Sequence, residues 1–445
     1  MKTLNGENHM RSRAIAAGVL ALATVLALGA CSAPSSDSRP NKQIVLWHME
    51  NTPSRVKVFQ ALADRYNATN PTHTVKIQVQ DWGQIYTKIA AAAQSGKQPD
   101  ILFAIPDFTT YVRGLGLGQP VTDVVNRVQA TSGLVAASTA PYTDAGESWA
   151  VPLYGMVQML WYRADLLRAA GVQPPKTWSE LLAATKKLTS GNTSGIALPA
   201  GKNLATDQVL YSLMITGGAA NFFTKDNKIA IDNSKTVAAF DLYAQLLAFS
   251  PKDSGNYSWP EPQAAFTSGA AAMAIEKGQY LAPFEAESGR PASDLGCAPI
   301  PVADNGGMPG SIYYSNGAMV LSKDKSTKDG AAKFLEWILD PKQYGDFLNA
   351  EPGLFLPITK NGGTESNWRQ NPTISTYKTC VDAMLKQADT GTLFGFVDGQ
   401  YVKSIGQISG QNFLAQAVQQ MYVNGQTPTQ AVTWIQKQMQ DAISK

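Results

Sequence analysis

Residues 44–103 read IVLWHMENTPSRVKVFQALADRYNATNPTHTVKIQVQDWGQIYTKIAAAAQSGKQPDILF, and the order of patterns in this stretch predicts the fold class. Apolar or alternating runs indicate strands, whereas apolar side chains three or four residues apart indicate helices. Strands are predicted at 44–47, 75–79 and 99–103, and helices at 55–67 and from an Asp81–Gln84 capping box through Ala93. This β-α-β-α-β order favours an α/β fold with a parallel sheet and helices on both faces.

The ends of these strands indicate where a ligand would bind. In open parallel sheets, ligands lie beyond the carboxyl ends of the strands. The segments after Trp47, Val79 and Phe103 are therefore expected to border one crevice.

Length and charge narrow the class of protein. The chain has 445 residues, which suits two domains because a single hydrophobic core stops growing near ~250 residues. Its net charge is +3, and Lys2, Arg11 and Arg13 against Glu7 supply +2 of it. The rest of the chain is almost neutral and offers no long-range field for phosphate backbones, so no nucleic-acid partner is expected.

The N-terminus has the pattern of a secretory signal peptide. Two arginines precede an apolar run over residues 14–27, and small residues follow. This order predicts a signal peptide over residues 1–30, with Met10 as an alternative start to Met1. The apolar run is short for a membrane span, and no later apolar stretch reaches ~18 residues, so the mature protein is not expected to cross a bilayer.

The end of this signal resembles a bacterial lipobox. Leu28-Gly29-Ala30 leads directly to Cys31, and the resemblance implies that the Cys31 thiol receives lipid and becomes the new N-terminus. A soluble secretion signal with a chance cysteine is the alternative. Residues 31–40 are rich in Ser and Pro and are expected to form a flexible tether.

A second region with strand and helix patterns begins near residue 150. Thr177 and Glu180 form a capping box before an apolar helical pattern, which predicts a helix start. Further helices are predicted at 206–216, 234–248, 327–339, 341–349, 411–423 and from Thr429 onward.

The motifs in this order resemble the extracellular solute-binding proteins of ABC importers, in the carbohydrate-binding cluster that includes maltose-binding protein. The matching pieces run through nearly all of the mature chain. They are IVLWH at 44–48, SGKQPDILFA at 95–104, WAVPLYGMVQMLWYRADLLRAAG at 149–171, PPKTWSELL at 174–182, AAFTSGAAAMAI at 264–275, APIPV at 298–302, AAKFLEWIL at 331–339 and NGQTPTQAV at 424–432.

The resemblance implies a fold of two discontinuous α/β lobes joined by three chain crossings, with a ligand cleft between the lobes. The implied crossings lie near Leu153–Tyr154, Tyr314–Asn316 and Pro357–Lys360. The implied lobes are 41–153 with 316–359, and 154–315 with 360–445. In this family the lobes close on the ligand, and a membrane permease recognises the closed form.

The function implied is a lipid-anchored, extracytoplasmic receptor that delivers a carbohydrate to the permease subunits of an ABC importer, as a monomer without cofactor or metal. A binding protein for a glycerol phosphate or glycerophosphodiester is the first alternative. A phosphate ligand would want an arginine or a helix N-terminus in the crevice, and the predicted crevice segments contain no arginine. An extracellular glycosidase is the second alternative.

Sugars present apolar faces, on which aromatic rings stack, and a rim of hydroxyls, which carboxylates and amides bind. Residues of these types are expected at the crevice from strand ends and from family positions. They are Trp47, His48, Asp81, Trp82, Asp107, Tyr154, Met156, Tyr280, Tyr314, Asn316 and Gln411, or Asn412 in place of the last.

Several of these positions depart from the maltose-binding pattern or have a plain structural interpretation. Ala104 stands where the relative has a stacking Trp, which Trp82 can replace, and Met156 stands where it has a sugar-binding Glu. Trp47 and His48 are equally compatible with a place in the core, and Asp81 with a helix cap. Core positions are favoured for Trp161, Trp178, Trp337 and Trp434, and a solvated turn for His73.

No enzyme is predicted. The chain lacks a Gly-x-Ser-x-Gly elbow, an HExxH pair and paired CxxC motifs. A pair of catalytic carboxylates leaves no sequence signature, which is why the glycosidase stays as an alternative.

Cys297 and Cys380 are the two thiols that remain once Cys31 is lipidated. Outside the cytoplasm thiols tend to be oxidised, and both residues fall in the same implied lobe, so a disulfide between them is expected. The alternative is two separately buried cysteines.

Overall fold

The computed structural model describes residues 42–360, 367–397 and 400–444. The predicted signal peptide, Cys31 and the whole predicted tether lie outside these residues. Within the described part of the chain, no helix is both long and apolar enough to cross a membrane.

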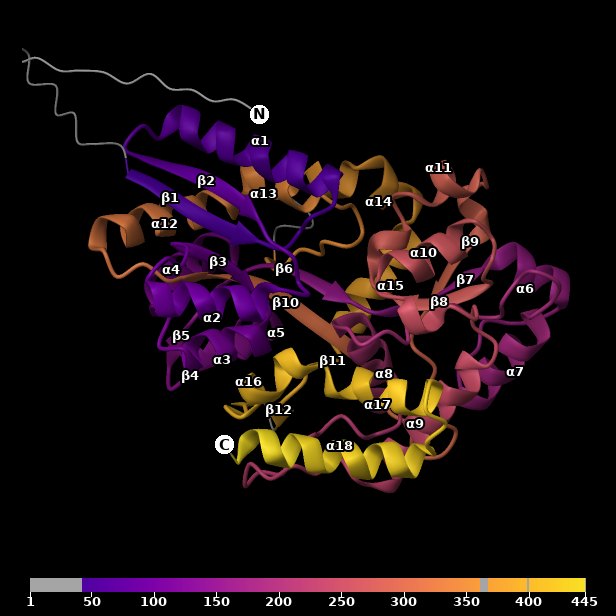
Figure 1. The fold of residues 1–445 in the computed structure, drawn as a ribbon. Helices are drawn as coiled ribbons and strands as arrows, with labels where there is room; N and C mark the ends of the chain where they lie inside the picture. Colours follow the sequence, from indigo (N-terminus) through magenta and orange to yellow (C-terminus); the bar gives the residue numbers. More distant parts are fainter. Residues whose placement is uncertain (1–41, 361–366, 398–399, 445) are drawn as a thin grey trace, which may run out of the picture. The chain divides into compact units, whose positions relative to one another are not determined.

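The larger sheet begins with the predicted parallel strands. It contains β1 (Lys42–His48), β2 (His73–Val79) and β3 (Ile101–Ala104), and β1 lies between the other two. Helices α1 (Pro53–Thr69) and α2 (Ile85–Ser95) connect the strands (Figure 1). The β-α-β-α-β prediction is confirmed.

The capping box predicted at Asp81 is wrong. The Asp81 carboxylate accepts a hydrogen bond from the Gly83 backbone N–H at 2.9 Å and so closes a local turn. Asp side chains favour this contact with the backbone two residues later. Helix α2 therefore begins at Ile85, after Gln84, whose side chain makes no cap.

A smaller, antiparallel sheet lies in the second half of the fold. It consists of β7 (Met159–Arg163) between β8 (Met273–Glu276) and β9 (Leu295–Ala298). The helices that follow β7 include α7 (Trp178–Leu188), α8 (Leu204–Thr216), α9 (Ser234–Leu247), α17 (Phe413–Tyr422) and α18 (Pro428–Ile443). The capping box of Thr177 and Glu180 is present at the start of α7, as predicted.

The predicted helices in the rest of the chain are also present, within two residues at each end. They include α12 (Lys325–Ile338) and α13 (Pro341–Leu348). Trp161 and Trp178 are buried, and Trp337 and Trp434 are half-buried against the same core, which agrees with the core positions expected for them.

Three chain segments connect the two halves and lie side by side. Strand β6 (Val151–Val157) leads into β7, and it pairs along its length with β10 (Ser311–Val320), which also pairs with β3. A third segment bridges to β6 through Leu356 and Gly155. The chain thus has the expected fold of two α/β lobes joined by three crossings.

The hydroxyls of two buried tyrosines bond to the backbone of the crossing segments and of β3. The Tyr142 hydroxyl donates to the Ala104 carbonyl at 2.8 Å and contacts the Ser315 carbonyl. The Tyr344 hydroxyl donates to the Leu153 carbonyl at 2.9 Å and accepts from the Ile358 N–H. Tyr142 thus links β3 to β10, and Tyr344 links β6 to the third crossing segment. In both cases the phenol is the partner that a buried backbone group needs.

A disulfide links β9 to a helix that follows the third crossing. Cys297 in β9 and Cys380 in α15 (Lys378–Ala388) have Cα atoms 5.8 Å apart. This is the pairing that the sequence leads us to expect. The two cysteines are 83 residues apart in the sequence, and their disulfide joins the two chain segments of the implied second lobe.

Candidate ligand-binding site

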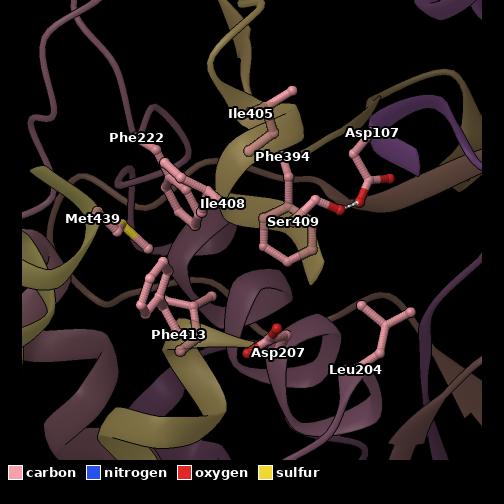
Figure 2. A pocket seen from close by; sticks show the side chains of 11 residues that line it. Asp107, Leu204, Asp207, Phe222, Phe394, Ile405, Ile408, Ser409, Phe413 and Met439 are labelled. Carbon is pink, nitrogen blue, oxygen red and sulfur yellow. Dashed lines mark hydrogen bonds between the residues drawn. The ribbon is translucent and has the colours of Figure 1, made fainter. Parts of the chain in front are cut away.

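A cavity lies where the first turns of three helices meet. Asp107 comes from α3 (Pro106–Gly114), Asp207 from α8, and Phe413 from α17. Helix α3 directly follows β3, so the cavity borders the carboxyl end of a parallel strand. Of the three strand-end segments expected at one crevice, only the one after Phe103 contributes to this lining. The full lining, most of it labelled in Figure 2, is Asp107, Leu204, Asp207, Phe222, Phe394, Ile405, Ile408, Ser409, Phe413, Leu414 and Met439.

Asp107 is a buried carboxyl group in this cavity. Only 1% of the residue is exposed. One oxygen, Oδ2, accepts a hydrogen bond from the Ser409 hydroxyl (Figure 2), whereas Oδ1 is buried without a hydrogen-bond partner. Burial raises the pKa of Asp107 to about 6, although the Ser409 hydroxyl and backbone N–H groups oppose this rise.

Asp207 is the second buried carboxyl group. Its Oδ1 accepts a hydrogen bond from the Ala415 backbone N–H in the first turn of α17 at 2.6 Å. Burial raises the pKa of Asp207 to about 8, and the charge of Asp107 raises it further. Asp207 is therefore largely protonated at neutral pH while the cavity is empty, and it is then able to donate a hydrogen bond.

Phenol groups surround the two carboxyls. The hydroxyl of Tyr86 lies 2.5 Å from the Ser409 hydroxyl. The hydroxyls of Tyr314 and Tyr401 are buried without a partner, and burial, with the charge of Asp107, raises the pKa of both well above the ordinary value. Asn316 lies two residues after Tyr314 on β10, hence on the same face, and its Nδ2 also lacks a partner. The site thus holds donors and acceptors that no protein group satisfies.

A second polar cluster joins the end of β1 to a crossing strand. The Tyr154 hydroxyl donates to Glu50 Oε1 at 2.7 Å. Arg55 binds Glu50 Oε2 through Nη1 at 2.9 Å and Glu351 Oε2 through Nε at 3.1 Å. The Tyr154 ring stacks on Phe355 with centroids 3.9 Å apart. Arg55 is therefore already paired with two carboxylates.

Tyr280 is packed more deeply than a free stacking platform would be. It is fully buried in the short helix Gly278–Tyr280, with its ring parallel to Trp161 at 5.7 Å and edge-on to Phe266 at 5.2 Å. Its hydroxyl lacks a partner, as does Gln279 Oε1 beside it. A side chain on Gly278 would lie 2.1 Å from the Gly353 carbonyl, so this helix rests directly on the turn after Glu351.

His48 lies in the hydrophobic core and not at the crevice. Its ring contacts Phe59 edge-on at 4.8 Å, and burial lowers its pKa to about 4, so it is neutral. Of the two positions that the sequence leaves open for His48, crevice and core, the structure has the core. The strand's period of two explains the placement, because His48 shares the inward face of Ile44 and Leu46.

The structure places the other predicted residues apart from the cavity lining. Trp47 is half-buried and donates from Nε1 to Gln78 Oε1 at 2.7 Å. Asp81 is exposed and accepts from Asn51 at 3.3 Å, Trp82 packs edge-on to Phe108 at 6.0 Å, Met156 is half-buried on β6, and Gln411 is exposed. Asn412 adopts a left-handed backbone with φ 54° at the start of α17. Among the described residues, no group of three or more His, Cys, Asp or Glu could hold a metal ion.

Sequence reasoning missed Asp207, Ser409, Tyr86 and Glu50. One signal was available for Asp207, because it is the only charged residue of α8, a helix whose residues are otherwise almost all buried. A lone acid in a helix without any other charged residue stands out against the rarity of fully buried carboxylates. Ser409 carries no such signal, since it lies 302 residues from Asp107.

Comparisons with known proteins agree with this fold. The family model for bacterial extracellular solute-binding proteins matches residues 51–345. A curated relative, the putative ABC transporter periplasmic-binding protein YcjN of Escherichia coli K12, is 24% identical over 434 residues and covers 96% of this chain and 99% of its own.

Two solved structures share the fold at low sequence identity. A solute-binding protein of Thermotoga lettingae, bound to α-D-tagatose, has a TM-score of 0.77 and 18% identity, over 91% of this chain and 100% of its own. UgpB of Mycobacterium tuberculosis, in complex with glycerophosphocholine, has a TM-score of 0.75 and 19% identity, over 91% and 99%. Because the family model covers well over half of the residues, this chain belongs to the bacterial extracellular solute-binding proteins.

Proposed function

We propose that this chain is the substrate-binding protein of an ABC importer, and that it captures a carbohydrate or polyol in the Asp107 cavity for delivery to membrane permease subunits. Family membership supports the transport role. Relatives described as binding tagatose and glycerophosphocholine support a small hydroxyl-rich ligand.

The observation that carries the proposal is the set of buried polar atoms without partners around the cavity. Asp107 Oδ1 and the hydroxyls of Tyr314 and Tyr401 are buried and unsatisfied in the described structure. Leaving such a group unpaired costs about 1–3 kcal/mol, so native proteins rarely do so without a function. The rings of Phe394 and Phe413 supply the apolar surface that the faces of a sugar ring need.

The proposed lobes explain how the protein would capture a ligand in this cavity, because the two lobes would close on it from opposite sides. We assign residues 41–153 and 316–359 to one lobe, and 154–315 and 360–445 to the other. Asp107 then belongs to the first lobe, and Asp207 and Ser409 to the second. A ligand held by all three would favour the closed arrangement by its differential affinity for that state.

A thermal-shift screen against mono-, di- and trisaccharides and linear polyols tests the function. A ligand present at 100 times its Kd adds ~2.7 kcal/mol to the stability, which is a measurable change in Tm. If no member of the panel changes the Tm, the proposed function is wrong. Turnover of aryl glycosides in the same samples would instead favour the glycosidase alternative.

Replacing Asp107 by Ala is expected to weaken binding of any ligand found in that screen by about 1–3 kcal/mol, because a directional hydrogen bond is lost. Isothermal titration calorimetry measures the change. Tyr280→Phe, which removes the unpartnered hydroxyl and keeps the ring packed on Trp161, tests whether Tyr280 also touches ligand. Asp123→Ala, an exposed acid in the first turn of α4 (Thr122–Ser132), serves as the control. If Asp107→Ala binds the ligand as tightly as the Asp123→Ala control does, the binding site lies elsewhere.

The lipid anchor is a separate part of the proposal. We expect Cys31→Ala to release the protein from the membrane fraction, because the thiol that would carry lipid is gone. Fractionation of washed cells with immunoblotting shows the result. Retention of the variant in the membrane fraction would contradict the anchor and leave ligand binding untouched.

A further inference from the structure

A short segment near the C-terminus contacts both of the proposed lobes. It consists of α16 (Ile405–Ile408) and the 3₁₀ helix that follows it (Ser409–Gln411), and we call residues 405–411 the clasp segment. The lobe assignment above puts it in the second lobe. Helix α16 packs against α18, which is assigned to the same lobe, and also against α3, which is assigned to the first.

The clasp segment is anchored in the second lobe by its apolar side chains. Ile405 and Ile408 are three residues apart, so they share one face of the helix. Both are buried and line the Asp107 cavity together with Met439 of α18. The other face of the segment is therefore the one that meets the first lobe.

Gly406 rests directly on the backbone of α3. A Cβ atom added at Gly406 would lie 2.9 Å from the backbone N of Tyr111 and 3.1 Å from the carbonyl carbon of Thr110. Gly406 has no positive φ, so its own backbone conformation would accept alanine, and the neighbouring α3 is what excludes a side chain. Because there is no room for a methyl group here, no ligand can lie between α16 and α3 at this point.

Gly410 makes a contact of the same kind with the ring of Tyr86 in α2. An added Cβ atom would lie 2.6 Å from Cδ1 of that ring, and Gly410 has no positive φ either. The Tyr86 ring packs on Phe108 of α3 with centroids 4.7 Å apart, so it is not free to move aside. This contact too is made by protein atoms alone.

Ser409 adds polar bonds between these two glycine contacts. Its hydroxyl donates to Asp107 Oδ2 and lies 2.5 Å from the hydroxyl of Tyr86. Asp107 and Tyr86 belong to the first lobe as assigned above, whereas Ser409 belongs to the second. The second lobe thus satisfies polar groups of the first with its own side chain, and these bonds need no ligand.

We propose that the clasp segment holds the two lobes closed on each other without a ligand, through Gly406 on α3, Gly410 on Tyr86 and Ser409 on Asp107. The proposal rests on the proposed function, because it uses the lobes and the cavity assigned there. A ligand then enters through a less populated open form, and its apparent affinity is reduced by the fraction of molecules that are open. The clasp segment thereby regulates how often the binding site is accessible.

Small-angle X-ray scattering of the ligand-free protein tests the proposal. The full chain carrying Cys31→Ala, which removes the thiol expected to carry lipid, serves as the parent for all variants. Unfolding in guanidinium chloride without reductant, followed by refolding, first removes any bound solute. The measured quantity is the radius of gyration, which increases when two lobes that are packed together move apart.

Gly406→Ala is expected to have a larger radius of gyration than the parent, because the added methyl group forces α16 away from α3. Gly114→Ala is the matched control. Gly114 also lies on α3 and has no positive φ, but an added Cβ atom there would have no neighbouring atom within 4 Å. The control is expected to keep the radius of gyration of the parent, and cooperative urea unfolding shows that each variant is folded.

Equal radii of gyration in Gly406→Ala and the parent would overturn the proposal, because the lobes then either stand open without a ligand or close without the clasp segment. An equal increase in Gly406→Ala and Gly114→Ala would overturn it as well, since the increase would not come from the contact with α3. Should Gly406→Ala fail to fold, Gly410→Ala, whose added methyl group meets Tyr86, gives the same test. None of these measurements uses a ligand, so their failure is distinct from a failure of the thermal-shift screen.

Discussion

Asp207→Asn is expected to stabilise the ligand-free protein at pH 8, by up to about 5 kcal/mol in the free energy of unfolding. The pKa of Asp207 rises from its ordinary value of 3.8 to about 8 in the folded protein, mainly because of burial. When the pKa of a group in the folded protein differs by one from its pKa in the unfolded chain, the stability changes by about 1.36 kcal/mol. Asparagine removes the cost of keeping this buried carboxyl protonated, and its amide oxygen is still able to accept from the Ala415 N–H.

The direction of the pH dependence of stability follows from proton binding in the folded and unfolded states. Between about pH 4 and pH 8 the folded protein keeps the Asp207 proton, whereas the unfolded chain has lost it. The unfolded state then binds fewer protons, so the free energy of unfolding contributed by this group falls as pH rises through that window. The advantage of Asp207→Asn over the wild type should therefore increase from pH 5 to pH 8.

Urea denaturation of both proteins at pH 5, 6, 7 and 8 measures the difference. Asp123→Asn, at an exposed acid in a comparable first turn, controls for a general effect of lost charge. If the difference in free energy of unfolding between wild type and variant stays constant over this range, Asp207 does not have the raised pKa of a buried carboxyl. Retaining such a group costs stability, which natural proteins accept mainly at functional sites.

Loss of the disulfide is expected to be the other large effect. The double variant Cys297→Ser, Cys380→Ser should lose roughly 4 kcal/mol of stability, because the bridge restricts a loop of 83 residues in the unfolded chain. The midpoint of urea unfolding should fall accordingly. Because Cys380 is buried beside the core, part of the loss will reflect the serine hydroxyl that replaces it.

Two controls isolate the covalent bond. The wild type measured with a reductant should approach the double variant, whereas the double variant itself should not respond to reductant. Alkylation of the unreduced, freshly secreted protein, followed by mass spectrometry, should find neither thiol modified. Modification of both cysteines, or equal stability with and without reductant, would show that no bridge forms.

Much of the fold could be predicted because its causes are local. The strand and helix periods of residues 44–103 identify the parallel strands, and the capping pair Thr177 and Glu180 identifies the start of α7. Helix α3 follows β3 directly, so the position of Asp107 at the carboxyl end of the sheet also follows from local order. Each of these features depends on neighbours within a few residues, and such neighbours are visible in a sequence.

Local patterns did not decide between interpretations where two of them share one pattern. Asp81 precedes Gln84 at capping-box spacing, but its side chain closes a turn on Gly83 instead. His48 ends a strand at the expected edge, but the alternation of β1 turns it into the core. In both cases the sequence is compatible with either interpretation. The structure was needed to choose between cap and turn for Asp81, and between crevice and core for His48.

The sequence by itself determined the α/β class, most helices, the family and the placement of Asp107. Tertiary structure alone decided which side chains meet Asp107. Ser409 arrives from 302 residues away, and Asp207 and Tyr401 from other distant segments. The physical reason is that periodicity records only whether a side chain is buried. Which buried polar groups share one cavity depends on how three helix first turns and two sheets pack, and that packing is set by long-range contacts.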